Sequence, residues 1–349
     1  MKSLDLYKKI AVVLIIVIIS YLLFRFLQIQ RQILSIAGGD TVYFKEGLSN
    51  DITFMTNNDT GPKVQSINPA KYPELTLKDF VIKSSYNTAC IGSTMSLDAI
   101  TYALTRGYRY LDFEVYLVDG LPCVGYGNDS KLKISSSNTL PFGQVLYNIV
   151  SEAFSAPTPN TNDPLFINLR MKTTDTTLYE TVAKSIDTNI KNRLYQGNVN
   201  SLTKLEDIMG KIVLLIDVTS APDYDSYPDC SSLINSTKQC FNLSSYVNLE
   251  LGGNSLRKST YYSLLNQTTN PPNINDDGTT DLSVLKLSYP DVVNDTGNPK
   301  ILPFIKDYGI QFLAVRLNML DTNLKAYETF FANCGNAIVP FSTALTNLN

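Results

Sequence analysis

Two carboxylates stand two positions apart in the apolar run YRYLDFEVYLV, residues 108–118, as Asp112 and Glu114. The run reads as a β-strand, in which alternate side chains share a face, so both acids point the same way. Two acids so placed can hold a metal ion or form salt bridges at a solvated rim. Arg170 stands in a second predicted strand, residues 163–172, and its guanidinium favours the salt bridge over the metal.

The composition bounds the classes of function. The chain has 349 residues, 44% hydrophobic and 17% charged, which suits one large core or two modest ones. Its formal net charge of −3 provides no positive field for a phosphate backbone, so no nucleic acid is expected as a partner. The chain contains no histidine, which excludes every mechanism that needs an imidazole, Ser-His-Asp and Cys-His arrangements included.

An apolar run from Ile10 to Leu27, interrupted by the charge of Arg25, predicts a transmembrane anchor within residues 1–34. At about 1.5 Å per residue the run covers roughly 27 Å, close to the hydrocarbon core of a bilayer. The alternative is a cleaved signal peptide, but the small residues at 35–37 lie too far beyond the run. Three lysines before the run face two arginines around its end, which predicts a single-pass protein with a cytoplasmic N-terminus.

Cysteines and glycosylation sequons leave the compartment open. Cys230 and Cys240 flank a polar segment and could pair in an oxidising compartment, whereas Cys90, Cys123 and Cys334 stand in apolar segments that predict burial. Six Asn-x-Ser/Thr sequons would suit a lumenal domain, yet a chain this rich in Asn, Ser and Thr contains several by chance. The sequons begin at Asn58, Asn128, Asn235, Asn242, Asn266 and Asn294.

The rest of the chain divides into a linker and one folded unit. In residues 35–79 Gly and Pro interrupt every apolar pattern, which predicts a stalk or a surface-hugging arm. In residues 80–349 predicted strands (108–118, 163–172, 210–218, 309–319) alternate with predicted helices (139–154, 177–194, 324–333). This alternation predicts an α/β fold, a closed TIM-type (β/α) barrel. Two polar segments, 219–245 and 266–298, are predicted to be loop excursions outside it.

Several motifs follow one another along the folded unit. Its first half contains SSYNT (84–88), AITYALTRGYRYLDFEVYLVDGLPCVGYG (99–127), DPLFINLRMK (163–172) and LTKLEDIMGKIVLL (202–215). Its second half contains KLSYP (286–290) and the segment 308–341. In this order the motifs resemble the X and Y halves of the catalytic barrel of phosphoinositide-specific phospholipase C (PLC). The likeness spans residues 80–342, so it implies the barrel of a PLC-like phosphodiesterase.

The resemblance also implies that the catalytic groups are lost. The positions of the family's two catalytic histidines hold Tyr86 and Tyr126. A phenol with a pKa of about 10 stays neutral at pH 7, so it can replace neither the charge nor the proton transfer of an imidazole. Leu215 and Leu287 stand where the family has a phosphate-binding Lys and Arg.

The family's calcium site implies a vestigial metal site here. Three of its positions hold the oxygen-bearing residues Asn87, Asp112 and Glu114, but the fourth holds Arg170. A guanidinium among these oxygens would take the place of the cation. The resemblance therefore implies no metal at this site, and no cofactor is expected.

These observations predict a pseudoenzyme: a membrane-anchored barrel that acts as a structural or interaction protein and docks a protein partner through its loops. The lack of Trp and His, with abundant Asn, Ile and Tyr, is typical of AT-biased genomes such as those of large DNA viruses. That pattern favours a minor virion component that links an internal membrane to a capsid. Two alternatives stay open: a divergent metal-independent phosphodiesterase that uses Arg170, Asp112 and Glu114, and a lipid-headgroup binder without turnover.

Overall fold

The computed structural model describes residues 64–127, 132–228, 230, 239–266, 284–291 and 297–348. The predicted membrane span from Ile10 to Leu27 lies outside these ranges, as does the predicted linker up to residue 63. Within the described ranges no helix has both the length and the apolar character needed to cross a bilayer.

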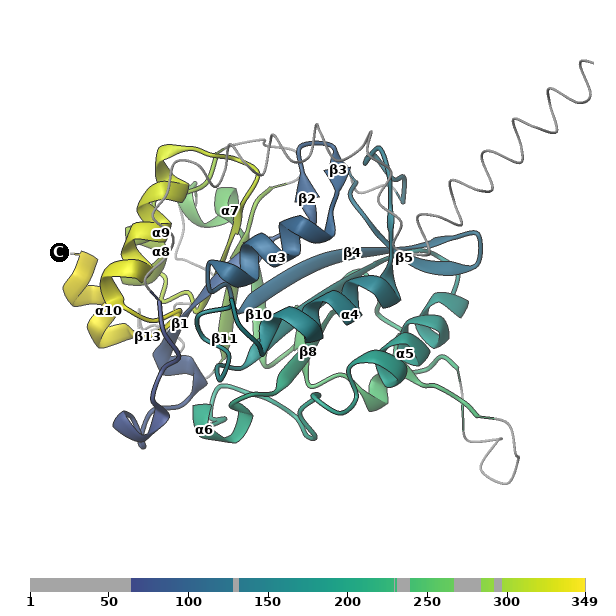
Figure 1. The fold of residues 1–349 in the computed structure, drawn as a ribbon, viewed down its shortest axis with the longest axis horizontal. Helices are drawn as coiled ribbons and strands as arrows, with labels where there is room; N and C mark the ends of the chain where they lie inside the picture. The colour runs from purple at the N-terminus through teal and green to yellow at the C-terminus, as the bar shows by residue number, and fades with distance from the viewer. Residues whose placement is uncertain are drawn as a thin grey trace, which may run out of the picture. The chain divides into compact units, whose positions relative to one another are not determined.

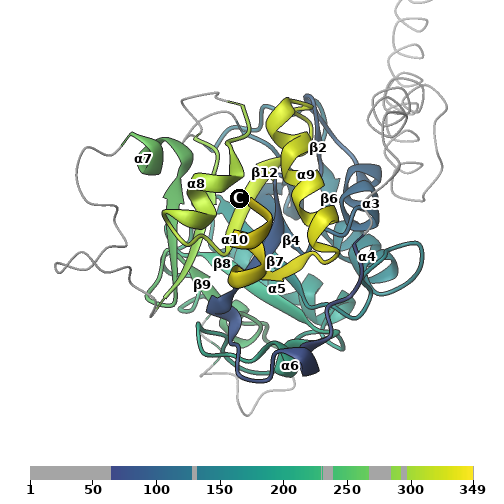
Figure 2. The same ribbon diagram turned by 90° about the vertical axis from the view of Figure 1, so that its left-hand side faces the viewer.

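Eight parallel strands form a closed barrel (Figure 1, Figure 2), as the sequence predicts. The barrel closes where Ser84 of the first strand pairs with Tyr110 of the second. Most strand residues are buried on both faces, which fits their near-continuous apolar runs. The strands are β1 (Phe80–Tyr86), β4 (Tyr110–Val118), β7 (Leu165–Lys172), β8 (Ile212–Asp217), β9 (Leu249–Leu251), β10 (Leu256–Thr260), β11 (Leu285–Tyr289) and β12 (Phe312–Arg316).

Helices cover the outside of the strands. Figure 1 shows α3, α4 and α5 side by side, and α8, α9 and α10 pack together elsewhere on the barrel (Figure 2). Ser96 and Asp321 cap the N-termini of α3 and α9, and Gly335 ends α9 with a φ of 74°. The helices are α3 (Leu97–Thr105), α4 (Phe142–Ala153), α5 (Thr177–Asn189), α6 (Leu205–Ile208), α7 (Tyr261–Leu265), α8 (Ile301–Lys306), α9 (Thr322–Cys334) and α10 (Phe341–Leu348).

A hairpin at the end of β4 returns the chain to the barrel mouth. Asp119 and Gly120 both have positive φ, 51° and 77°, as a two-residue hairpin turn requires. The return strand β5 therefore brings Gly127, which follows it, back beside Glu114 of β4. The remaining short elements are β2 (Cys90–Ile91), β3 (Thr94–Met95), β5 (Leu121–Gly125), β6 (Leu140–Pro141), β13 (Ile338–Pro340), and the 3-10 helices η1 (Pro69–Lys71), η2 (Leu77–Asp79) and η4 (Leu243–Ser245).

Residues 64–79, the described part of the predicted stalk or surface-hugging arm, pack against the N-terminal end of the barrel. The N–H of Gln65 donates to the carbonyl of Gly335, ahead of β13, at 2.8 Å. Val64 and Leu77 are both buried in the barrel's apolar clusters. Val64 lies outside any helix or strand and Leu77 begins the 3-10 helix η2, so neither a helical nor a strand period reveals them.

The predicted excursion 266–298 is wrong in part, because it contains the barrel strand β11. Leu285 and Leu287 point into the barrel, while Lys286 and Ser288, which alternate with them, are buried on the other side. Because a lysine and a serine occupy the alternate positions, the sequence of this strand resembles that of a polar loop. The excursion 219–245 does lie between β8 and β9, and Cys230 and Cys240 within it form a disulfide.

A buried carboxylate fastens residues 64–79 to the barrel. Asp163, ahead of β7, accepts hydrogen bonds from the N–H of Ile67 at 2.9 Å and from Asn160 Nδ2 at 3.1 Å. Burial raises the pKa of Asp163 to about 6, because the nearby Arg109 and these hydrogen bonds offset only part of the lost hydration.

Asp163 should make the barrel less stable as the pH rises through its folded-state pKa. The unfolded carboxyl titrates near pH 3.9, so between that pH and about 6 the folded state binds more protons and the free energy of unfolding falls with pH. Relative to Asp163→Asn, the wild type should lose about 3 kcal/mol between roughly pH 4 and 7, measured by urea unfolding. A difference between the two proteins that does not vary with pH would contradict this account.

Candidate functional site

Polar side chains face the inside of the barrel near the C-terminal ends of the strands. On β4 these are Asp112 and Glu114, and on β7 they are Asn168 and Arg170. The register pairs Asp112 with Asn168 and Glu114 with Arg170, so the four share one face. Asn168 Nδ2 donates to Asp112 Oδ1 at 2.8 Å. Strand alternation and register therefore build the site that the sequence places here.

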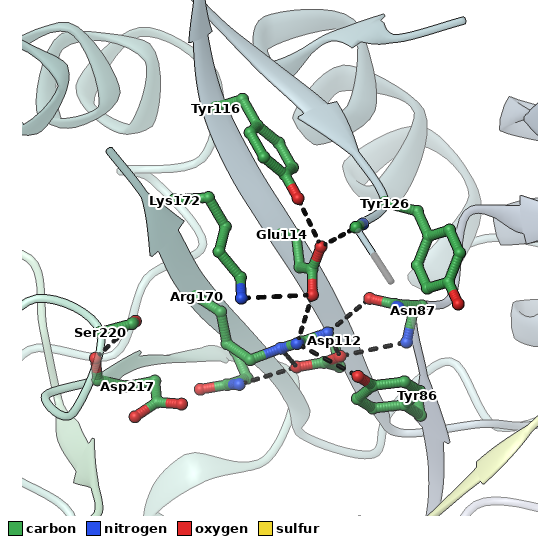
Figure 3. Close-up of polar contacts among 12 residues, drawn as sticks. Tyr86, Asn87, Asp112, Glu114, Tyr116, Tyr126, Arg170, Lys172, Asp217 and Ser220 are labelled. Atoms are coloured by element: carbon green, nitrogen blue, oxygen red, sulfur yellow. Dashed lines mark hydrogen bonds and ion pairs between the residues drawn. The ribbon is translucent and has the colours of Figure 1, made fainter. Parts of the chain in front are cut away.

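The guanidinium of Arg170 lies at the centre of this cluster (Figure 3). Its Nε and Nη2 donate to the two oxygens of Asp112 at 3.0 and 2.7 Å. Its Nη1 donates to Glu114 Oε1 at 2.6 Å and to Tyr86 Oη at 3.3 Å. Its Nη2 also donates to Asn87 Oδ1 at 2.5 Å. A guanidinium has five N–H donors, and all five have acceptors within the protein.

Glu114 is held by further donors on its other side (Figure 3). Its Oε2 accepts from Tyr116 Oη at 2.8 Å and from the N–H of Gly127 at 2.8 Å. Lys172 Nζ lies 3.7 Å from Glu114 Oε1. The side chain of Glu114 is only 1% exposed, so these contacts replace the water that a buried carboxylate loses.

A stack of aromatic and cationic groups lies across the barrel mouth. The guanidinium carbon of Arg170 lies 4.6 Å from the centre of the Tyr86 ring. Tyr86 stacks on Tyr289 of β11, with 6.1 Å between ring centres and 16° between planes. Lys258 Nζ of β10 lies 5.4 Å from the Tyr289 ring and 2.6 Å from Asp217 Oδ2 of β8. The stack thus joins strands on both halves of the chain.

The electrostatics hold these groups in fixed charge states. Burial lowers the pKa of Arg170, but the carboxylates of Asp112 and Glu114 raise it well above its ordinary value, so the guanidinium stays charged. Burial raises the pKa of Tyr86, and the attraction of Arg170 only partly opposes it. The Tyr86 phenol therefore stays protonated at neutral pH.

The mouth leaves almost no space inside. The cavity there measures about 10 Å³ and is lined by residues that include Tyr86, Arg170 and Tyr289. That volume suits one water molecule, whereas small-molecule sites measure about 300–1,000 Å³. Leu215 and Leu287, both buried, belong to the apolar cluster that fills the barrel below. These two leucines stand where the resemblance places phosphate-binding side chains, and in this structure they are part of the packed core.

Tyr126 lies beside the cluster, immediately after β5 (Figure 3). It is half-buried and packs against the outer apolar core, while its carbonyl accepts from the N–H groups of Ser135 and Ser136 at 2.7 and 3.1 Å. The structure thus brings Tyr86, Asn87, Asp112, Glu114 and Arg170 together, whereas Tyr126 lies beside this cluster (Figure 3).

Sequence reasoning missed the residues that complete the site. Asn168 carries a usable signal, because it precedes Arg170 by two positions on one predicted strand and must share its face. Asp217 is the last but one residue of the predicted strand 210–218, near the strand end where barrels place polar site residues. Lys258 and Tyr289 carry none, because neither β10 nor β11 was recognised as a strand.

These residues do not fit the calcium ion that the resemblance implies for the family. Calcium takes six to eight oxygen ligands, but the oxygens of Asn87, Asp112 and Glu114 already accept from Arg170. The fixed positive charge of that guanidinium would also repel the ion. In the described part of the chain, no group of three or more His, Cys, Asp or Glu side chains could hold a metal.

Known proteins share this fold. Residues 74–217 match the family described as phosphatidylinositol-specific phospholipase C, X domain. No curated protein matches the chain. Among solved structures, PLC21 from L. pealei aligns with a TM-score of 0.58 and 14% identity over 79% of this chain and 38% of its own. PLC21 from S. officinalis aligns with a TM-score of 0.55 and 15% identity over 80% and 38%.

The chain thus corresponds to well under half the length of either PLC21 protein. At this identity the likeness to solved structures shows the fold, and the X-domain match covers most of the first half of the barrel, including β1, β4, β7 and β8. Taken together, the X-domain match and the shared fold make this barrel a relative of the phosphatidylinositol-specific phospholipase C catalytic barrel.

Proposed function

We propose that this barrel is a pseudoenzyme, a PLC-like fold that is kept for a structural or interaction role. The observation that carries the proposal is the saturation of Arg170: its five donors all bind protein oxygens, so none is left for a substrate phosphate. The small cavity at the mouth agrees, because a phosphodiester group could enter only if the Tyr86–Tyr289 stack moved away.

The chain also lacks acid–base groups suited to the family reaction. It contains no histidine, and the phenol of Tyr86 is held neutral by burial. Each lost acid or base role costs about 10²- to 10⁴-fold in rate, so the loss of two removes measurable turnover.

The purified chain should hydrolyse neither phosphatidylinositol nor simpler phosphodiesters above a protein-free blank, with or without millimolar calcium. The same assay on Arg170→Ala separates the outcomes. Turnover that this substitution abolishes would overturn the proposal and establish a divergent phosphodiesterase. Turnover that it leaves unchanged, in a fraction that co-purifies with the chain, would identify a contaminant and leave the barrel inactive.

The proposed role is to hold a protein partner near a membrane. Exposed apolar side chains flank the two long loops: Tyr227 is 47% exposed, Tyr262 is 53% and Leu265 is 50%. Such side chains are enriched where proteins meet. The composition, which lacks Trp and His, favours one version of this role: a minor virion component that links an internal membrane to a capsid.

Removal of residues 1–34 should release the barrel from membranes. The apolar run from Ile10 to Leu27 is the expected lipid contact, and the deletion leaves residues 64–79, which pack on the barrel, intact. Flotation of the full chain and the truncated chain with lipid vesicles measures the difference. A truncated chain that still floats after a high-salt wash would show that the barrel itself binds lipid.

A further inference from the structure

The five cysteines form one disulfide near the surface and three free thiols that are buried or half-buried. Cys230 and Cys240 are joined in the loop between β8 and β9. Cys90 and Cys123 are buried and Cys334 is half-buried. Burial raises the pKa of Cys90 and of Cys334 to about 11, which keeps both thiols protonated and unreactive. This arrangement suits an oxidising compartment, where exposed thiols would cross-link.

The amide of Asn242 holds the neck of the disulfide loop. Its Nδ2 donates to the carbonyls of Asp225 and Pro228, each at 3.0 Å, and its Oδ1 accepts from the N–H of Ser244 at 2.8 Å. These contacts bring the two sides of the loop together just outside Cys230 and Cys240. Both N–H donors of Asn242 are used, so a sugar on its nitrogen would remove one of these hydrogen bonds and loosen the loop neck.

Asn266, the other sequon asparagine among the described residues, has the opposite surroundings. It is exposed at the C-terminal end of α7, and its Nδ2 donates to the carbonyl of Tyr262 at 3.2 Å within the same turn. That bond lies at the surface and can be exchanged for water at little cost.

A hollow beside Asn266 leaves room for a sugar. It measures about 320 Å³, and its lining includes Tyr262, Leu265, Pro299, Lys300 and Asn323 together with Asn266 itself. An aromatic ring and apolar side chains can pack on the C–H face of a sugar, while the amide and ammonium groups can bond its hydroxyls. The hollow is separate from the Arg170 cluster, with which it shares no lining residue.

We infer that the barrel resides in an oxidising, glycosylating compartment and carries an N-linked glycan on Asn266 but not on Asn242. The inference rests on the proposed membrane anchor, whose cytoplasmic N-terminus places the barrel on the far side of the bilayer. The co-reactant is a polyprenyl diphosphate oligosaccharide. Asn266 Nδ2 bonds to the anomeric carbon of the sugar as the bond from that carbon to the diphosphate oxygen breaks. The diphosphate leaves with the electron pair, and the amide loses one proton to solvent.

The test is expression of the full chain in eukaryotic cells, followed by an alkaline carbonate wash of the membranes. The membrane-bound chain is treated with peptide N-glycosidase in heavy-oxygen water, which converts each glycosylated Asn to a mass-labelled Asp. Peptide mass spectrometry should find the label at position 266 and not at position 242, and the label should disappear in Asn266→Gln. Cys230 and Cys240 should appear in one disulfide-linked peptide until a reductant is added.

The outcomes separate this inference from the proposed anchor. A chain released by the carbonate wash would contradict both the proposed membrane anchor and this inference. A chain that stays in the membrane with Asn266 unlabelled would contradict the inference alone. A label on Asn242 would also overturn it, because the native loop neck uses both donors of that amide. Asn242→Gln should lower the melting temperature, whereas Asn266→Gln made in unglycosylating cells should not.

Discussion

Arg170→Ala should lower the free energy of unfolding by about 3–5 kcal/mol, a fall in melting temperature of roughly 5–8 °C for a domain of this size. The substitution removes the ion-pair partner of Asp112 and leaves Glu114 with only the more distant Lys172, where the two acid side chains are only 4% and 1% exposed. It also removes the cation that packs on the Tyr86 ring. Thermal and urea unfolding measure the loss, with no ligand or substrate present.

Lys172→Ala is the matched control. Lys172 Nζ also faces Glu114, but at 3.7 Å and with a side chain 16% exposed, so its removal should cost about 1 kcal/mol or less. If Arg170→Ala were as mild as this control, the guanidinium would not be what holds the two acids in the barrel mouth.

Arg170→Glu should turn the cluster into a calcium site. The substitution replaces the central cation with a third carboxylate, beside the oxygens that now accept from Arg170 on Asn87, Asp112 and Glu114. Without metal these acids repel one another and the variant should melt far below the wild type. Millimolar calcium should recover much of that loss, because a ligand that binds only the folded state stabilises it by mass action. The wild type should melt at the same temperature with and without calcium.

The control for charge alone is Arg170→Gln, which removes the guanidinium without adding a carboxylate. Calcium should stabilise it much less than Arg170→Glu, and magnesium should do little for either, since it demands a stricter geometry. If the variant cannot be purified without calcium, refolding from urea into calcium or into a chelator gives the same comparison. A wild-type protein that calcium stabilises would contradict the assignment of Arg170 as the resident cation.

Much of the barrel could be predicted because apolar residues recur in its strands and helices with a clear periodicity. The predicted strand 163–172 is β7 from Leu165, and the predicted helix 324–333 lies within α9. The pairing of Arg170 with both acids follows from strand alternation, which fixes a face before any tertiary contact is known. The loss of imidazole chemistry can be read from composition alone.

The groups that close the mouth could not be predicted, because tertiary pairing creates them. Tyr86 and Tyr289 are 203 positions apart by their numbers, and only the closure of the barrel stacks their rings. Lys258 lies on a five-residue strand flanked by polar residues, which gives no clear period. The burial of Val64 and Leu77 could not be predicted for a related reason: isolated apolar side chains bury well without forming a long regular element.

The attachment of residues 64–79 determines the order in which contacts would break if the chain were pulled. A tether pulling from the N-terminus would load Val64 and Gln65 first, then the bond from Ile67 to Asp163, and only later the buried Leu77. Contacts that are loaded one after another break one at a time, at low force. The hydrogen bonds between the parallel strands of the barrel would have to break together, at a higher force. Under load the attached segment would therefore unwind and lengthen the tether while the barrel stayed folded.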